Sequence, residues 1–129
     1  MEDSNTEQII FNYNKETGLK SIIAINNTTL GPAMGGCRML PYESTEDALL
    51  DVIQLALGMT YKCALSGTNF GGGKTVVIGD PNKDKNEILL RDLGRFVQTL
   101  NGRYYMGTDV GTSSEDFIHV ANETEYVVS

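Results

Sequence analysis

Histidine and cysteine are scarce in this 129-residue chain, and their scarcity narrows the chemistry that the protein can perform. There is one histidine, His119, which excludes a multi-histidine metal site. The two cysteines, Cys37 and Cys63, do not have a metal-binding spacing, and we expect both to be reduced thiols. No unbroken run of 18 apolar residues occurs, so we expect no membrane-spanning segment.

Basic residues are also in the minority, with 10 Lys and Arg against 17 Asp and Glu, for a net charge of −7. This balance argues against nucleic acid or an anionic membrane as the main partner. Residues 1–5 are acidic and polar, unlike a signal or transit peptide, so we expect a cytoplasmic protein. The length and the hydrophobic content of 40% predict one domain with a substantial core.

The hydrophobic pattern predicts an α/β fold with a mixed, partly parallel sheet flanked by helices. Residues 8–13 and 19–25 are two apolar runs joined by a turn that ends at Gly18, and we expect them to pair as a hairpin. From Ser44 onward, helical and extended patterns alternate, which is typical of α/β layering. The expected helices are residues 44–62, 87–101 and 113–124. The other expected strands are residues 33–39, 75–78, 103–106 and 125–128.

The most informative segment is Gly71-Gly72-Gly73-Lys74, which leads into an apolar run that begins at Thr75. Three successive glycines pack no side chains, so a chain keeps them where the backbone must pass close to something or adopt a positive φ. We predict a loop over residues 66–73 that delivers Lys74 into a tight, partly desolvated site. A lysine in such a site gives up its proton more easily, which makes it useful for acid/base chemistry.

A phosphate-binding loop is a weaker interpretation of the same residues. That motif requires G-x-x-x-x-G-K-[ST], and Gly67 lies one residue too far from Gly73-Lys74-Thr75 to satisfy it. A phosphate loop also follows a strand and opens a helix, whereas this glycine run follows a helical pattern and opens a strand. A plain glycine-rich connector with a solvated lysine is a further interpretation that stays open.

Two more ionisable residues stand beside glycine or a break at the ends of expected elements. Lys62 ends the first expected helix, and Asp109 lies between Gly107 and Gly111 just after a strand. Ligands of open α/β sheets gather at such ends, where two lysines and an aspartate suit a carboxylate, an amine and proton transfer. Each charge alone is more often a surface residue. For Arg38, a structural ion pair is favoured over anion binding.

Six motifs, taken in order, closely resemble the N-terminal, substrate-binding and dimerisation domain of the glutamate/leucine/phenylalanine/valine dehydrogenases. They are Gly18-Leu19-Lys20 and residues 28–39, 58–62, 71–74 with 77–81, 100–104 and 107–112. Any one motif alone is weak evidence for the family, but six in order are strong evidence. The resemblance covers about residues 7–128. It implies reversible, NAD(P)-dependent oxidative deamination of an L-amino acid to its 2-oxo acid and ammonia.

The resemblance also implies a role for each matching residue. Lys62 would bind the substrate α-carboxylate, helped by the backbone at Gly35 and Gly36. Lys74 would be the catalytic acid/base that activates water and stabilises the carbinolamine. Asp109 would hold the amino group and shuttle its proton.

Met34 and Gly107 correspond to positions that line the family's substrate pocket. Glycine at position 107 leaves more room for an aromatic ring, and residues 107–119 look like those of bacterial phenylalanine dehydrogenases. The resemblance therefore favours a bulky apolar amino acid, with phenylalanine preferred over leucine or valine. A nearby family histidine is replaced by Asn26, for which the sequence offers no interpretation.

The dinucleotide fingerprint G-x-G-x-x-G does not occur in these residues. We therefore expect residues 1–129 to be the substrate-binding and dimerisation domain, with NAD bound by a Rossmann domain absent from this chain and the chain inactive alone. Expected partners are the small-molecule substrate and further copies of the chain, with residues 8–13 as a free sheet edge. No metal is expected. The alternative is a free-standing, non-catalytic domain for self-assembly or for binding an amino acid or 2-oxo acid.

Overall fold

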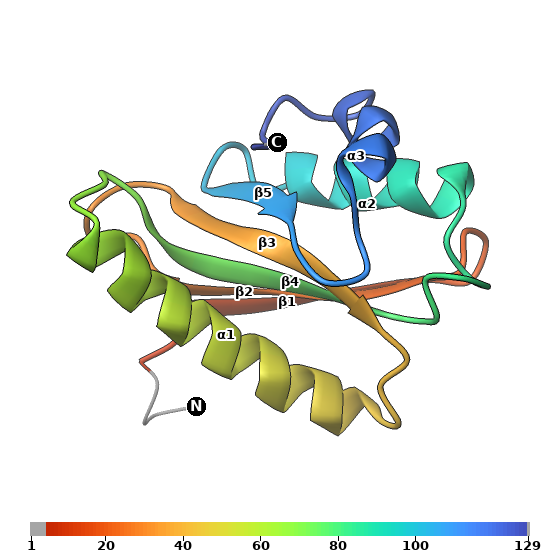
Figure 1. Cartoon of the computed structure of the whole chain (residues 1–129), viewed down its shortest axis with the longest axis horizontal. Helices are drawn as coiled ribbons and strands as arrows, with labels where there is room; N and C mark the ends of the chain where they lie inside the picture. The colour runs from red at the N-terminus through yellow and green to blue at the C-terminus, as the bar shows by residue number, and fades with distance from the viewer. Residues whose placement is uncertain (1–4, 129) are drawn as a thin grey trace.

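Residues 5–128 are described by the computed structural model, and they form one five-stranded sheet and three helices (Figure 1). Residues 1–4 and 129 lie outside this description, and with them most of the acidic N-terminal segment and the last residue of the expected domain. The strands are β1 (Gln8–Asn14), β2 (Leu19–Asn27), β3 (Ala33–Leu40), β4 (Gly71–Ile78) and β5 (Tyr104–Thr108). The helices are α1 (Thr45–Leu65), α2 (Glu87–Gln98) and α3 (Ser114–Ala121).

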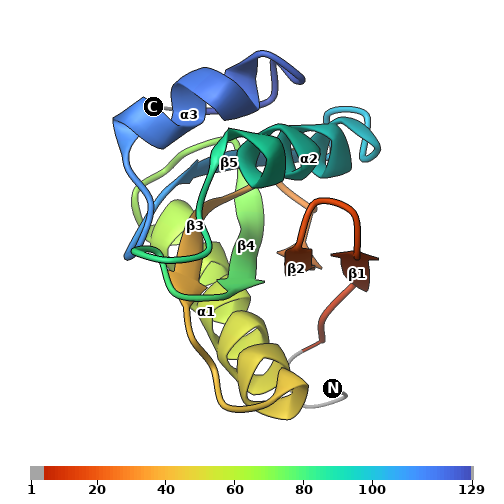
Figure 2. The ribbon, with the colours of Figure 1, turned by 90° about the vertical axis from the view of Figure 1, so that its right-hand side faces the viewer.

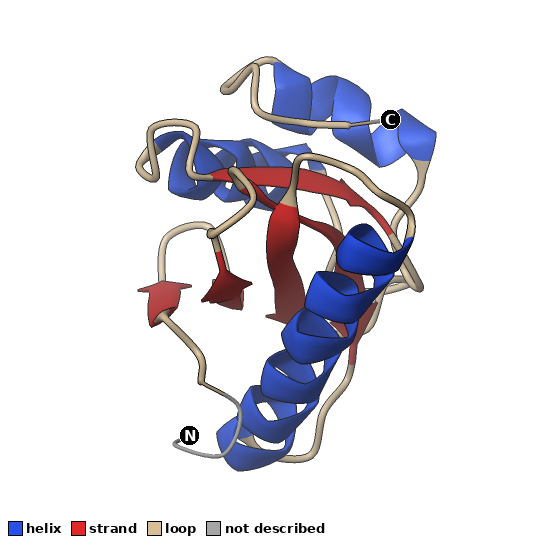
Figure 3. Cartoon of the chain, turned by 90° about the vertical axis from the view of Figure 1, so that its left-hand side faces the viewer, coloured by secondary structure: helices blue, strands red, loops and turns tan. Residues whose placement is uncertain are grey.

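The sheet is mixed, with the strand order β1-β2-β4-β3-β5. β1 and β2 form the predicted antiparallel hairpin, and β2 pairs antiparallel with β4. β3 lies between β4 and β5 and is parallel to both. Helix α1 covers one face of the sheet, and α2 and α3 cover the other, as the two side views show (Figures 2 and 3). The predicted α/β class with a partly parallel sheet is confirmed.

Side-chain caps start all three helices where the sequence predicts them. The Ser44 side chain accepts a hydrogen bond from the backbone N–H of Asp47 at the start of α1. Asn86 caps α2 in the same way. Ser113 and Asp116 form a reciprocal capping box at the start of α3.

The ends of the helices and the last predicted strand differ more from the prediction than the helix starts do. Helix α1 continues beyond Lys62, and α3 ends at Ala121 instead of residue 124. The predicted strand over residues 125–128 is reduced to one parallel bridge between Met106 and Val127. These ends depend on tertiary packing, which local pattern does not specify.

The glycine run was predicted to be a loop, and this is wrong, because Gly71, Gly72 and Gly73 are the first residues of strand β4. None of the three has a positive φ. A Cβ on Gly71 would lie 1.8 Å from the Asn27 carbonyl oxygen, and one on Gly72 would lie 2.1 Å from the Thr60 amide nitrogen. The glycines are therefore required by close backbone approach, which was one of the two reasons considered for them.

The structure of β4 also rules out the phosphate-loop interpretation. Lys74 and Thr75 continue β4 instead of opening a helix. A phosphate loop needs the free N–H groups of a helix N-terminus directly after its lysine. The backbone N–H and C=O groups of this strand are instead shared with β2 and β3.

Helix α1 is 21 residues long and contains an 18-residue window with a mean hydropathy of 1.3, long and apolar enough by those measures alone to cross a membrane, although the sequence lacks an unbroken apolar run. Core helices of soluble proteins have the same length and composition. Ala48, Val52 and Ala56 of α1 are fully buried and pack with Ile22 and Val76 of the sheet. One face of α1 is therefore covered by β2 and β4.

We predict opposite effects for two glycine-to-alanine substitutions along this contact. Gly72→Ala places a methyl group 2.1 Å from the Thr60 backbone, so α1 must move away from β4. We expect it to lower the free energy of unfolding by at least about 2 kcal/mol. Gly58→Ala, the control, lies within α1 with nothing within 4 Å of the new methyl group. It should raise that free energy by about 1 kcal/mol. Urea denaturation measures both, and equal effects would contradict this account.

Candidate functional site

The residues singled out from the sequence converge on one cavity of about 460 Å³. The cavity contains all seven predicted site residues, namely Met34, Gly35, Gly36, Lys62, Lys74, Gly107 and Asp109. It also contains three residues that sequence reasoning did not single out, namely Met59, Thr108 and Val128. The predicted convergence is therefore present, and it brings together residues from β3, α1, β4 and the end of β5.

Lys74 is held in the middle of the sheet, with 7% of its surface exposed. Its strand, β4, has neighbours on both sides, so the backbone that carries the side chain is fixed. The Lys74 Nζ lies 3.3 Å from Asp109 Oδ2. A buried ammonium requires such a partner, because its desolvation is otherwise costly.

Asp109 lies directly after β5, in a short loop that is tied to β3. Its backbone N–H donates to Thr112 Oγ1 at 3.1 Å, and that hydroxyl donates to the Cys37 carbonyl at 2.7 Å. A Cβ on Gly36 would lie 2.6 Å from the Thr108 carbonyl oxygen and 2.9 Å from Asp109 Cβ. Glycine at position 36 therefore allows the loop to bring its carboxylate close to β3.

A second cation reaches the same carboxylate oxygen. Arg38 Nε donates to Asp109 Oδ2 at 2.8 Å. Burial opposes ionisation of this carboxyl, but the Arg38 hydrogen bond and the charge of Lys74 outweigh it and lower the pKa of Asp109 below its ordinary value of 3.8. The predicted ion pair of Arg38 is confirmed, but its partner is a site residue 71 positions away, which no local signal reveals.

Lys62 reaches the cavity from the last turn of α1, and its side chain is exposed to solvent. The approach of α1 to β4 at Gly72 brings this turn over the site. Met59, one turn earlier, adds an apolar wall. The site thus has one solvated lysine and one buried lysine, which suit binding and proton transfer respectively.

Tyr104 supports the site from beneath. Its buried hydroxyl lies 2.7 Å from Thr75 Oγ1 and donates to the Gly35 carbonyl at 3.0 Å. Burial raises the pKa of this phenol well above its usual range, so it stays protonated. A Cβ on Gly73 would lie 2.9 Å from the Tyr104 ring. Tyr104 was identified only as a strand residue, but its hydroxyl also links β3 to β4 next to Lys74.

The room beside Gly107 is smaller than the sequence suggests. A Cβ at this position would lie 3.1 Å from Val128 Cγ2 and 3.2 Å from the Val128 carbonyl oxygen. The expectation that Gly107 by itself leaves space for an aromatic ring therefore needs correction, because Val128 occupies that space. Val128 comes from the segment after α3, where pattern alone predicted only a strand.

Asn26, which the sequence left uninterpreted, has a structural place. It is 3% exposed, and its side-chain oxygen accepts a hydrogen bond from Thr60 Oγ1 at 2.7 Å. This bond joins β2 to α1 at the point where the helix crosses Gly72. Both cysteines are buried free thiols, and burial raises the pKa of Cys37 to about 12, so that thiol is unreactive.

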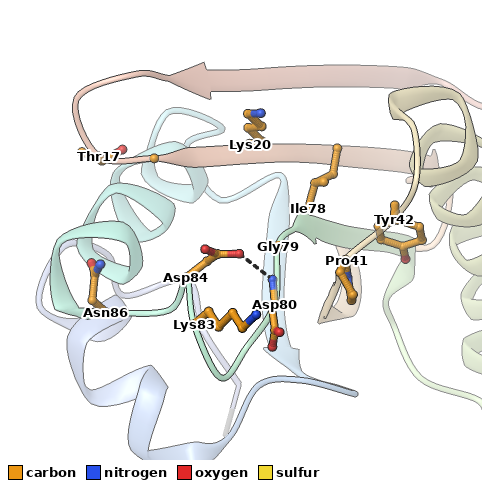
Figure 4. Close-up of a pocket in the computed structure, with 11 residues that line it drawn as sticks. Thr17, Lys20, Pro41, Tyr42, Ile78, Gly79, Asp80, Lys83, Asp84 and Asn86 are labelled. Atoms are coloured by element: carbon orange, nitrogen blue, oxygen red, sulfur yellow. Dashed lines mark hydrogen bonds between the residues drawn. The ribbon is translucent and has the colours of Figure 1, made fainter.

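A slightly larger cavity, of about 520 Å³, lies beyond the C-terminal ends of β3 and β4 (Figure 4). Its charged residues are Lys20, Asp80, Lys83 and Asp84, and none of these side chains is buried. The Asp84 carboxylate accepts from the Asp80 backbone N–H at 2.8 Å, as Figure 4 shows. This cavity lacks the buried charge of the Lys74 site, which therefore remains the candidate.

Comparisons with known proteins agree with the sequence resemblance. Residues 5–126 match the family model described as the Glu/Leu/Phe/Val dehydrogenase dimerisation domain. A phenylalanine dehydrogenase from Caldalkalibacillus thermarum is 60% identical over 125 residues, which are 97% of this chain and 34% of that protein. A leucine dehydrogenase from Geobacillus stearothermophilus is 58% identical over 127 residues, or 98% of this chain and 35% of that protein.

A solved structure, that of L-tryptophan dehydrogenase from Nostoc punctiforme, superposes with a TM-score of 0.95 at 47% identity. The match covers 98% of this chain and 38% of that one. The chain thus spans about a third of the length of the curated relatives it matches.

We predict that the stability contributed by Asp109 depends on pH with a definite sign. Because the pKa of this carboxyl is lowered in the folded state, its contribution is complete above pH 3.8 and is lost as the pH falls through the lowered value. Asp109→Asn should therefore be less stable than the wild type at neutral pH, and the difference should shrink in acid. Chemical denaturation from pH 7 downward measures this. A difference that is constant with pH would contradict it.

Proposed function

This chain belongs to the Glu/Leu/Phe/Val dehydrogenase family, whose dimerisation domain it matches over residues 5–126, and on that premise we propose its function. We propose that residues 1–129 are the substrate-binding and assembly domain of an NAD(P)-dependent L-amino-acid dehydrogenase. The reaction is the reversible oxidative deamination of a bulky apolar amino acid to its 2-oxo acid and ammonia.

One observation carries this proposal. A buried lysine and an aspartate form an ion pair, Lys74 with Asp109, inside a cavity that also contains the solvated Lys62. An amino acid has one carboxylate and one ammonium group on the same carbon. The cavity has a cation suited to the first and an anion suited to the second, a short distance apart.

The geometry suggests how the substrate is oriented. Lys62 would pair with the α-carboxylate at the open side of the cavity, whose lining includes Gly35 and Gly36 of β3. The amino group would lie toward Asp109, whose carboxylate is ionised at neutral pH. The Cα of the substrate would then lie next to Lys74.

Proton transfer in the proposed reaction uses the two partners of the ion pair. Hydrolysis of the imino acid requires a water molecule to lose a proton as it attacks the imine carbon. Lys74 would accept that proton, stabilise the carbinolamine and pass the proton across the 3.3 Å contact to Asp109. Asp109 would deliver it to the nitrogen as the C–N bond breaks and ammonia leaves, and Lys74 would take up the hydroxyl proton of the carbinolamine as the 2-oxo acid forms.

The described residues do not fit a nicotinamide dinucleotide. The spaces beside Gly71 and Gly72 are filled by Asn27 and Thr60, so the glycine run leaves no cradle for a pyrophosphate. Nor does a helix N-terminus follow it, since Lys74 and Thr75 remain in β4. We propose that NAD binds to a separate Rossmann domain and therefore derive no hydride-transfer step from this chain.

The substrate side chain would contact the apolar part of the cavity, formed by Met34, Met59 and Val128. The relatives named above act on phenylalanine, leucine and tryptophan and have comparable identities to this chain, so identity does not select among them. We propose a bulky apolar amino acid and favour phenylalanine, with Val128, which lies beside Gly107, limiting its size.

We further propose that the chain assembles with copies of itself in the cytoplasm. The family model is described as a dimerisation domain. Strand β1 is at the edge of the sheet, and Phe11 and Tyr13 on it are about half exposed, at 49% and 46%. An edge strand with exposed aromatic residues is suited to pairing with another chain. The alternative is a non-catalytic domain for assembly or amino-acid binding. It would have the same exposed strand edge and the same cavity, but it would not catalyse deamination.

Binding of matched ligands tests the site directly. We expect the chain to bind both L-phenylalanine and 3-phenylpropanoate, which lacks the amino group. Lys62→Met should weaken both by about tenfold, because it removes a charged hydrogen bond to the carboxylate. Asp109→Asn should weaken L-phenylalanine alone. Calorimetric titration measures the affinities, with Lys83→Met, an exposed lysine of the other cavity, as the control.

Equal losses for all three variants would contradict the assignment of the cavity. Sedimentation of the same samples separates ligand binding from assembly, since neither Lys62 nor Asp109 lies on the β1 edge.

The size limit imposed by Val128 is separately testable. Val128→Ala removes the side chain that lies against Gly107, so the cavity should accept a larger ring. We expect the affinity for L-tryptophan relative to L-valine to rise roughly tenfold. The control is Val110→Ala, an exposed valine outside the cavity. An unchanged ratio would mean that Val128 does not limit the substrate.

A further inference from the structure

We propose that Arg38 is a positioning residue of this site, which holds the Asp109 carboxylate in place while Asp51, itself hydrogen-bonded by Tyr42, holds Arg38. The use of this arrangement in substrate binding rests on the proposed function. The arrangement itself is a property of the folded chain and can be tested without any ligand.

The two cations share one oxygen atom of Asp109. Arg38 Nε lies 2.8 Å from Asp109 Oδ2, and Lys74 Nζ lies 3.3 Å from the same atom. The shorter contact belongs to the residue that does not line the cavity. Arg38 therefore contacts the carboxylate from outside the site, while Lys74 contacts it from within.

Arg38 is itself held on its other side. Its Nη1 lies 3.6 Å from Asp51 Oδ2 in α1, and the Tyr42 hydroxyl donates a hydrogen bond of 2.5 Å to that same carboxylate oxygen. The side chains of Arg38, Asp51 and Asp109 are 24–28% exposed, so their charges are only partly screened by water. The charges alternate in sign from Asp51 through Arg38 and Asp109 to Lys74.

An arginine is suited to this position in a way that a lysine is not. The guanidinium presents Nε and Nη donors in a rigid plane, so it can contact carboxylates on two elements at once. Here one carboxylate follows β5 and the other is in α1, with Arg38 on β3 between them. A lysine carries a single ammonium group on a flexible stem and would contact only one of the two carboxylates.

The consequence for the site is a carboxylate that stays ionised and in one position. The charged residues around Asp109 are Arg38 from β3, Lys74 from β4, and Asp51 and Lys62 from α1. Without Arg38, Asp109 would lose its shortest charged contact and depend on Lys74 for its position. An amino group entering the cavity would then meet a carboxylate that is less strictly placed and more easily protonated.

The test follows the Asp109 carboxyl carbon by NMR as the pH of the full chain is lowered, with Asp109→Asn used to assign the signal. In Arg38→Gln we expect the midpoint of this transition to move to higher pH. Arg38→Lys should give a smaller move in the same direction. The matched control is Arg91→Gln, because Arg91 of α2 likewise bridges two carboxylates, of Glu87 in α2 and of Glu123 just after α3, on the other face of the sheet from α1. It should leave the Asp109 midpoint unchanged.

An Asp109 midpoint that is the same in wild type and Arg38→Gln would overturn the proposal, because a merely structural arginine would lower stability without changing this titration. If Arg38→Gln does not fold, Arg38→Lys decides between the same outcomes. Asp51→Asn provides a further check, since loss of the contact that orients Arg38 should move the midpoint in the same direction by less.

Ligand binding provides a second measurement. Arg38→Gln should reduce the affinity for L-phenylalanine several-fold more than that for 3-phenylpropanoate, since only the first ligand has an amino group for Asp109. Equal losses for the two ligands would count against positioning. If wild type binds neither ligand, the proposed function fails, while the Asp109 titration still decides the role of Arg38.

Discussion

The site depends on the absence of side chains at three successive positions of β4. Without a Cβ at Gly71, Gly72 and Gly73, the strand lies closer to β2, to α1 and to the Tyr104 ring than any other residue would allow. This close packing makes the next residue, Lys74, nearly inaccessible to water at the centre of the sheet. It also brings the end of α1, with Lys62, over the same cavity. The three glycines lose more conformational entropy on folding than other residues would, but they allow the close packing that positions the two lysines.

The buried lysine in turn determines the electrostatics around it. A cation that is mostly removed from water needs a nearby anion, and Asp109 satisfies this need. Asp109 is held by Arg38 as well, and the Tyr104 hydroxyl links β3 to β4, the strand that carries Lys74. The elements that carry these four residues meet only in the finished sheet. The cavity is therefore a product of strand order together with the position of α1, which contributes Met59 and Lys62.

Sequence reasoning reached those features that local chemistry specifies. The caps at Ser44 and Ser113 and the hairpin after β1 follow from residue type and spacing, and the family motifs placed Lys74 and Asp109 in one site. It did not reach features that depend on contacts distant in sequence. Whether a glycine run is loop or strand depends on what packs against it, and the partner of Arg38 depends on β3 and β5 lying side by side. Val128 was missed for the same reason.

The edge position of β5 has a consequence for how the chain folds. Asp109 directly follows this strand, which among the five strands pairs only with β3 and on its other side has the single bridge to Val127. In a partly folded state that contains β3 and β4 but not β5, Arg38 and Lys74 would lie near each other without the carboxylate that both contact. Their mutual repulsion raises the free energy of that state and not of the native one. The carboxylate that follows β5 thus disfavours any state in which this strand is missing from the sheet, which makes folding more cooperative.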